Sequence, residues 1–277
     1  MRVVRPEFLP DPALSREEME TLQRDLAAAA TFEDDLGFDP AAVGVETSIP
    51  TDEVIVGGDE TGRQAALDAD GASDAPVVAG VDQAFLEERA VSAVVAIRDG
   101  TVVESAHAVT DLEIPYVPGL LAFREGRPII AALEALATEP DLLVVDGSGR
   151  VHFRQAGIAT HVGVLVDVPA VGVAKNLLCG EPARSLEGKL PAGERVPILA
   201  DDSVDAPAGT VIGHAYQSRQ YDSGSRHVNP LYVSPGHRVG AETATDLVAA
   251  CCAGYKLPEP TRLADHAADA VKRAVRG

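Results

Sequence analysis

The chain has 277 residues, of which 46% are hydrophobic, so it is long enough for one large domain with a substantial core. Acidic residues outnumber basic residues by 43 to 23, which gives a formal net charge of −20. No apolar run reaches the roughly 18 residues that a membrane span needs, and the first residues show no signal-peptide pattern, so we expect a soluble, cytoplasmic protein.

The acidic composition indicates a halophilic protein, because repulsion among like charges keeps such a surface soluble. Taken alone, the sign of the charge argues against a nucleic-acid partner. The three cysteines, Cys179, Cys251 and Cys252, form no C-x-x-C pattern, and their odd number argues against a disulfide framework. We therefore expect reduced, mostly structural thiols.

The N-terminal segment, residues 1–36, contains a predicted helix that belongs to the main domain. Ser15 and Glu18 have the spacing of a capping box, in which each side chain bonds the other residue's backbone N–H. Residues 37–76 are rich in glycine and acidic residues, so we expect a flexible or loosely packed insertion and not a domain. Residues 77–277 form the main domain.

The main domain begins with β-rich runs. One apolar run ends at Asp82, and the next two runs meet at Asp99-Gly100, a strong hairpin signal. Helices and buried strands then alternate: helices at 127–138, 157–168 and 241–254, and strands at 140–147, 169–175 and 209–218. Three antiparallel strands followed by this alternation predict an α/β fold with a mixed sheet flanked by helices.

Three acids stand at positions where they can meet. Asp82 and Asp146 follow apolar strands, and Glu125 follows a proline-containing loop and precedes a helix. Strand ends of an open α/β sheet converge on one crevice, where clustered carboxylates repel one another unless a cation or a shared proton relieves them. Their hard oxygen ligands suit Mg²⁺ or Mn²⁺. The alternative is three solvated or capping acids.

The loop before Glu125, IPYVPGLLAFREG at residues 114–126, is unusual. Pro115 and Pro118 exclude a central strand, because proline cannot donate to a ladder. They also brace Tyr116, which stands between them.

Six segments, read in order, resemble the signature blocks of the endonuclease V family. They are VAGVDQAF, PYVPGLLAFREG, VVDGSGRVHFRQAGIATHVG, VPAVGVAKNLL, NPLYVSPGHRVGAETA and GYKLPEPTRLAD, between residues 77 and 265. The resemblance implies a ribonuclease H-like fold and a Mg²⁺-dependent endonuclease that recognises deoxyinosine. The family cuts the second phosphodiester bond 3′ to the lesion and leaves 3′-hydroxyl and 5′-phosphate ends.

The resemblance also implies roles for single residues. Asp82, Glu125 and Asp146 match the family's metal-binding acids, and Mn²⁺ is expected to substitute for Mg²⁺. Lys175 would place a positive charge beside the scissile phosphate. His237 resembles a family histidine near the metal, where it would orient water or move a proton.

The proline-braced loop matches the family's wedge. Tyr116 would stack into the gap that the extracted base leaves, and Pro118 would stiffen the loop so that little entropy is lost on binding. The expected base pocket is mostly backbone, and it excludes guanine because hypoxanthine lacks the exocyclic amine. The residues expected around the base are Gly119, Leu121, Gly147, His152 and Ile158.

Three functions remain open at this stage. The first is cleavage of inosine-containing DNA by a monomeric enzyme with no membrane partner. The second is cleavage of inosine in RNA at the same site. The third is a non-catalytic lesion-binding protein, against which the intact acids argue. A glycosidase with paired carboxylates would explain neither Lys175 nor the tyrosine.

Overall fold

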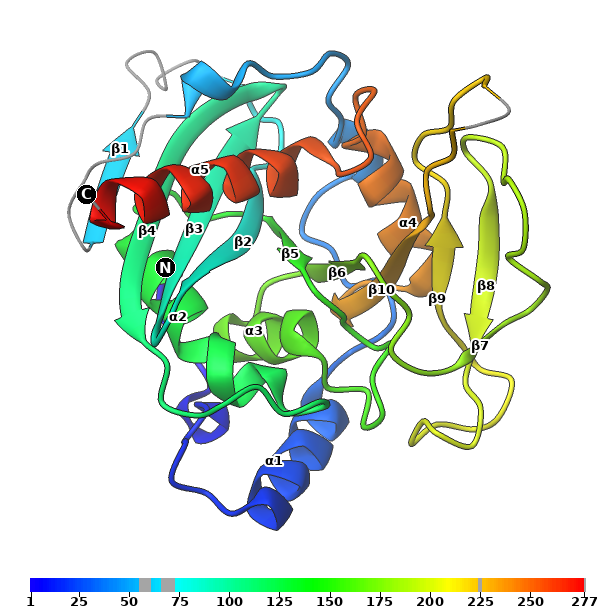
Figure 1. Ribbon diagram of the computed structural model, residues 1–277, viewed down its shortest axis with the longest axis horizontal. Coiled ribbons are helices and arrows are strands. Elements are labelled where there is room, and N and C mark those ends of the chain that lie inside the picture. Colours follow the sequence, from blue (N-terminus) through cyan, green and yellow to red (C-terminus); the bar gives the residue numbers. More distant parts are fainter. Residues whose placement is uncertain (55–60, 66–72, 224–225, 277) are drawn as a thin grey trace.

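The computed structural model of the protein describes residues 1–54, 61–65, 73–223 and 226–276 (Figure 1). Its strands form one mixed sheet in the order β1-β4-β3-β2-β5-β6-β10-β9-β8-β7. The strands are β1 (Thr61–Ala65), β2 (Val78–Leu86), β3 (Arg89–Arg98), β4 (Thr101–Asp111), β5 (Leu142–Asp146), β6 (Ala170–Ala174), β7 (Glu181–Pro182), β8 (Arg195–Leu199), β9 (Val211–Tyr216) and β10 (Leu231–His237). The pairs β2–β5 and β5–β6 are parallel, and the other pairs are antiparallel.

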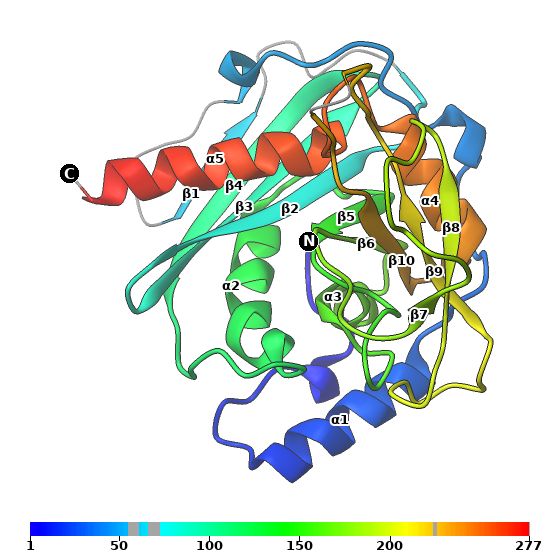
Figure 2. The same cartoon turned by 45° about the vertical axis from the view of Figure 1, so that its right-hand side comes forward.

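The described residues contain five α-helices, four of which cover the two faces of the sheet. They are α1 (Arg16–Ala29), α2 (Leu121–Ala135), α3 (Ile158–Val166), α4 (Ala241–Ala250) and α5 (Glu259–Arg276), with short 3₁₀ turns at Pro6–Phe8, Pro40–Ala42 and Thr51–Glu53. Helices α2 and α3 pack on one face, and α4 and α5 lie on the other (Figures 1 and 2). The predicted mixed sheet flanked by helices is confirmed. Within the described residues, no helix combines the length and the apolar character that a membrane crossing requires.

The antiparallel half of the sheet follows the sequence prediction. Asp99 and Gly100 join β3 to β4, and both have positive φ angles, of 50° and 70°. This is the backbone that a two-residue primed turn requires, which explains the Asp-Gly pair. The apolar run before Asp82 does not end there, because β2 continues to Leu86 and pairs with β3 along its whole length.

The N-terminal segment is anchored as expected. The capping box of Ser15 and Glu18 is present at the start of α1. The acidic segment after it differs from the expectation of loose packing, since Val43, Val45 and Ile49 are buried. The backbone N–H of Ile49 donates to the buried carboxylate of Glu259, which lies at the start of α5. Apolar residues spaced between the acids therefore fix this part of the segment to the core. The remainder of the predicted insertion lies in part outside the described residues.

Helix α2 begins before the predicted boundary. It starts at Leu121, so Glu125 lies inside the helix and Pro128 also falls within it. Proline costs a helix one hydrogen bond. The buried face of α2, which includes Phe123, Ile129 and Leu133, stabilises the helix despite that loss.

Helix α5 crosses β2 at very close range. A Cβ atom added to Gly80 would overlap the backbone of Pro260 in the first turn of α5. Glycine is therefore required at this point, and the contact fixes the position of α5 over the antiparallel strands β2, β3 and β4 (Figure 1).

We predict that Gly80→Ala destabilises the protein by about 1–3 kcal/mol or more, because β2 and α5 must separate to admit a methyl group. The matched control is Gly44→Ala, whose Cβ would have its nearest neighbour at 3.9 Å. Denaturant unfolding of both variants measures the difference. Equal stability of Gly80→Ala and wild type would contradict the close contact.

Candidate active site

A cavity of about 350 Å³ opens at the carboxyl ends of β5 and β6. It is lined by residues from the loop before α2, from the segment after β5 and from the end of β6. The residues singled out from the sequence that line it are Tyr116, Gly119, Leu121, Glu125, Asp146, Gly147, His152, Ile158 and Lys175. The structure therefore brings most of the predicted site residues together.

The two aspartates lie side by side on adjacent parallel strands. Val81 of β2 pairs with Val145 of β5, so the residues that follow them, Asp82 and Asp146, are level with each other. Asp82 is 5% exposed. Its Oδ1 accepts from the backbone N–H of Gln83 at 2.6 Å, and its Oδ2 has no hydrogen-bond partner. Burial, together with the charge of Asp146, raises the pKa of Asp82 to about 9.

Glu125 and Lys175 complete the charged part of the cavity. Burial raises the pKa of Glu125 to about 7; Arg124 opposes this change and Asp146 adds to it. Nζ of Lys175 donates to Oδ2 of Asp146 at 3.0 Å. Burial lowers the pKa of Lys175, but the charge and hydrogen bond of Asp146, together with the charges of Asp82 and Asp265, raise the pKa above its ordinary value, so the ammonium form is favoured.

The acids lie near one another but are not arranged as a complete metal site. Among the described residues, no three His, Cys, Asp or Glu side chains form a ready-made metal-binding group. The chemistry nevertheless fits a hard divalent cation, because the donors are carboxylate oxygens and one buried oxygen of Asp82 lacks a partner. Burial and, to a smaller extent, repulsion by Asp146 raise the pKa values of Asp82 and Glu125, and a cation here would stabilise the ionised form of both carboxyls.

Sequence reasoning missed a fourth acid, Asp265 of α5. This residue is exposed, and its charge acts on both Asp82 and Lys175. Helix α5 itself was not predicted, although Leu263, Ala264, Ala267, Ala268 and Val271 form one buried helical face. The apolar periodicity of these residues is the sequence signal that would have placed Asp265 on a helix.

The structure does not bring His237 to the cavity, which corrects the expectation that it lies beside the acids. His237 pairs with Ala170 at the start of β6, whereas Asp146 pairs with Val173 near its end. The Nε2 of His237 lies 3.1 Å from Oδ1 of Asp167, and its Nδ1 accepts from the backbone N–H of Thr31. Because β10 runs antiparallel to β6, His237 lies at the amino end of β6, opposite to the carboxyl ends of β5 and β6 where the cavity opens.

The proline-braced loop contains a tight turn that presents Tyr116. The backbone N–H of Leu120 donates to the carbonyl of Val117 at 3.0 Å, with Pro118 and Gly119 between them. Gly119 has a φ of 79°. Proline followed by a positive-φ glycine is the signature of a type II turn. Tyr116, just before the turn, is 62% exposed at the rim of the cavity.

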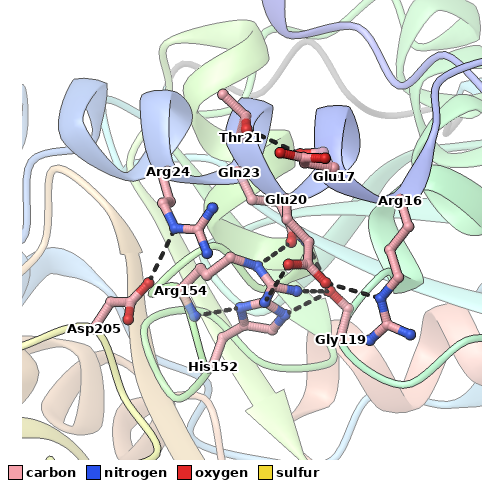
Figure 3. A network of polar contacts seen from close by, with 10 residues as sticks. All are labelled: Arg16, Glu17, Glu20, Thr21, Gln23, Arg24, Gly119, His152, Arg154 and Asp205. Carbon is pink, nitrogen blue, oxygen red and sulfur yellow. Dashed lines mark hydrogen bonds and ion pairs between the residues drawn. The ribbon is translucent and has the colours of Figure 1, made fainter.

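The inner wall of the cavity is tightly packed. Gly147 has a φ of 140°, and a Cβ there would lie 2.5 Å from the side chain of Ile158. His152 is buried, and burial lowers its pKa to about 4. Its Nδ1 accepts from the backbone N–H of Arg154, so the ring hydrogen is on Nε2, which donates to the Gly119 carbonyl at 3.1 Å (Figure 3).

Comparison with known proteins is consistent across sequence and structure. The sequence model of the family described as Endonuclease V matches residues 60–266. The chain is 61% identical to an Endonuclease V of Halobacterium salinarum, covering 97% of this chain and 99% of the relative. It is 58% identical to an Endonuclease V of Haloarcula marismortui, covering 98% of each.

Two solved structures from different organisms share the fold. The catalytic domain of human Endonuclease V has a TM-score of 0.71 at 30% identity, covering 94% of this chain and 98% of that one. Ciona intestinalis Endonuclease V, solved with a 24mer DNA containing an inosine followed by a ribo-adenosine, has a TM-score of 0.66 at 22% identity and covers 94% and 97%. The ribonuclease H-like fold expected from the sequence is confirmed by these similarities.

Proposed function

The chain belongs to the endonuclease V family, and from this premise we propose that it is a Mg²⁺-dependent repair enzyme for deoxyinosine in DNA. It cleaves the second phosphodiester bond 3′ to the lesion and leaves 3′-hydroxyl and 5′-phosphate ends. The observation that carries the proposal is the pair of the buried Asp82 and the partly exposed Asp146, level with each other beside a cavity that has the exposed Tyr116 at its rim.

Each charged residue has a role in this reaction. Asp82, Glu125 and Asp146 would hold Mg²⁺, and Mn²⁺ would substitute for it. The bound cation supplies a Lewis acid for in-line displacement at phosphorus. Lys175 lies beside Asp146 with a side chain that is 48% exposed, so its ammonium group can contact a phosphate oxygen of the substrate. Asp265 adds negative charge nearby and makes a small contribution to the raised pKa of Lys175.

The cavity accepts the extracted base. Tyr116 fills the gap that the base leaves in the duplex, and the stiff turn at Pro118 and Gly119 keeps it extended. Leu121, Gly147 and Ile158 line the cavity and restrict its width. Hypoxanthine lacks the exocyclic amine of guanine, so a narrow pocket selects it sterically.

The acidic surface is compatible with a nucleic-acid substrate. The relatives from Halobacterium and Haloarcula are halophilic, in agreement with the composition. At high salt, phosphate contacts contribute little to affinity. Stacking by Tyr116 and the fitted cavity must therefore supply most of the binding free energy. Arg124 and Arg127 are candidates for local phosphate contacts. Arg154 and Arg238, also expected to contribute, are less suitable, because Arg154 is bonded to Gln23 and Gly119 and Arg238 pairs with Asp35 beside His237, away from the cavity.

A second candidate function is cleavage of inosine in RNA. The observation in its favour is that the DNA bound to the Ciona protein carries a ribo-adenosine directly after the inosine. We propose that the enzyme is cytoplasmic and acts as a monomer.

We predict that the wild-type protein, in high KCl with Mg²⁺, cuts inosine-containing DNA at the second phosphodiester bond 3′ to the lesion. Asp82→Ala and Asp146→Ala should each reduce the rate by at least about 10³-fold while binding of the inosine strand stays measurable, because Tyr116 and the residues expected around the base are unchanged. Gel analysis of end-labelled DNA and RNA strands, with Mg²⁺ and with chelator, provides the measurement.

The control for these variants is His237→Gln, which alters a buried histidine away from the cavity and should retain cleavage. Full activity of either aspartate variant, or equal cleavage in chelator, would refute the metal site. Faster cleavage of the RNA strand would favour the second function over the first.

We predict that Tyr116→Ala weakens binding to duplex inosine DNA about five- to 150-fold, because base–aromatic stacking contributes roughly 1–3 kcal/mol. Tyr116→Phe should be nearly neutral, since stacking needs the ring and not the hydroxyl. Single-stranded inosine requires less extraction, so its loss in Tyr116→Ala should be smaller. Equal losses on both substrates, or a large loss in Tyr116→Phe, would rule out a wedge.

A further inference from the structure

Three side-chain donors converge on one carbonyl oxygen at the rim of the cavity. The Gly119 carbonyl accepts from Nε2 of Gln23 at 2.9 Å, from Nε2 of His152 at 3.1 Å and from Nη2 of Arg154 at 3.2 Å (Figure 3). A carbonyl oxygen has two lone pairs, so three donors saturate it. This oxygen is therefore engaged by the protein and is not an acceptor for a base in the cavity.

Gln23 connects this carbonyl to helix α1. It is fully buried, and its Oε1 accepts from Nε of Arg154 at 2.7 Å. One amide thus donates to the turn and accepts from the arginine that also contacts the turn. Arg154 lies 3.8 Å from Glu20, one helical turn before Gln23. These contacts direct Gln23 and Glu20 of α1 toward Arg154, and Gln23 also toward the Gly119 carbonyl (Figure 3).

Apolar packing brings α1 to the same loop. Met19 of α1 forms a small buried cluster with Leu120 and Phe123, and Leu14, Leu22, Ile114 and Val117 pack around it. These apolar contacts hold the helix against the loop, but apolar contacts are non-directional and do not fix the orientation of a peptide group. The hydrogen bond from Gln23 fixes the orientation of the Gly119 peptide, because hydrogen bonds weaken steeply away from linearity.

A small shift of the Gly119 backbone would change the shape of the cavity. It lines the cavity and adopts a φ of 79°, and a Cβ there would lie 3.1 Å from the ring of Phe153. A glycine has a wide choice of backbone angles, so the chosen angles must be imposed by its neighbours. The three donors supply that restraint.

We propose that Gln23 is a positioning residue for base selection: through the Gly119 carbonyl, helix α1 holds the Val117–Leu120 turn and so sets the width of the base cavity. Loss of this hydrogen bond widens the cavity and reduces the preference for inosine over guanine. The inference rests on the proposed function for its selectivity, but its structural part is independent of that function.

The sharpest variant is Gln23→Glu. A glutamate has the same shape and keeps an acceptor for Arg154, but it has no donor for the Gly119 carbonyl and sets an anionic oxygen against it. Gln23→Met, which fills a similar volume without either polar contact, is the second variant in case a buried carboxylate prevents folding. The matched control is Thr21→Val, because Thr21 is exposed on the same helix and its hydroxyl donates only to the backbone of Glu17.

The first measurement is amide hydrogen exchange of the free protein. We expect the Leu120 N–H, which closes the turn, to exchange about tenfold faster in Gln23→Glu or Gln23→Met and at the wild-type rate in Thr21→Val. Unchanged exchange in both Gln23 variants would overturn the proposal, and so would equal acceleration in Thr21→Val.

The second measurement compares cleavage at inosine with cleavage at guanine in the same strand. We expect the ratio of the two kcat/KM values to fall about tenfold in the Gln23 variants, while the Mg²⁺ concentration for half-maximal activity stays constant. A purely structural role would lower both rates equally, leave the ratio unchanged and so refute the selectivity claim. If the turn loosens but the wild type cuts no inosine substrate, the positioning role is supported and the proposed function fails.

Discussion

The site depends on two carboxylates that lie level with each other on neighbouring parallel strands, one buried (Asp82) and one partly exposed (Asp146). Asp82 and Asp146 repel each other, and the low exposure of Asp82 denies it the solvation that would ease that repulsion. The ammonium group of Lys175 offsets part of the cost through its bond to Asp146. Asp82 keeps one oxygen without a partner. An unsatisfied buried acid costs stability, and such costs are typically found where function requires them.

The surrounding elements hold this pair in place. The parallel β2–β5–β6 core sets the register, and Gly80 allows α5 to approach closely enough for the charge of Asp265 to act on Asp82. On the other side, α1 and the Val117–Leu120 turn shape the cavity through backbone atoms. In this account, charged side chains at the ends of the strands carry out the cleavage. The Val117–Leu120 turn, which buried polar contacts hold in place, selects the base.

Sequence reasoning found the parts of this arrangement that depend on local patterns. The Asp99-Gly100 hairpin, the capping box at Ser15 and the grouping of Asp146, Glu125 and Lys175 follow from turn chemistry, strand patterns and family resemblance. Sequence reasoning failed for features that depend on contacts between distant parts of the chain. Pro118 and Gly119 indicated a stiff loop, but nothing in the sequence shows that Gln23, about a hundred positions earlier, bonds its carbonyl. The position of His237 depended on the direction of β10, which apolar runs do not reveal.

The central claim is that Asp82 and Asp146 together hold a divalent cation. The most direct test is anomalous diffraction from crystals soaked in Mn²⁺. The account predicts a strong anomalous peak within coordination distance of both carboxylates, with Nζ of Lys175 turned away from Asp146 toward the substrate side. A Mn²⁺ peak elsewhere, or none with the Lys175–Asp146 bond still in place, would contradict it.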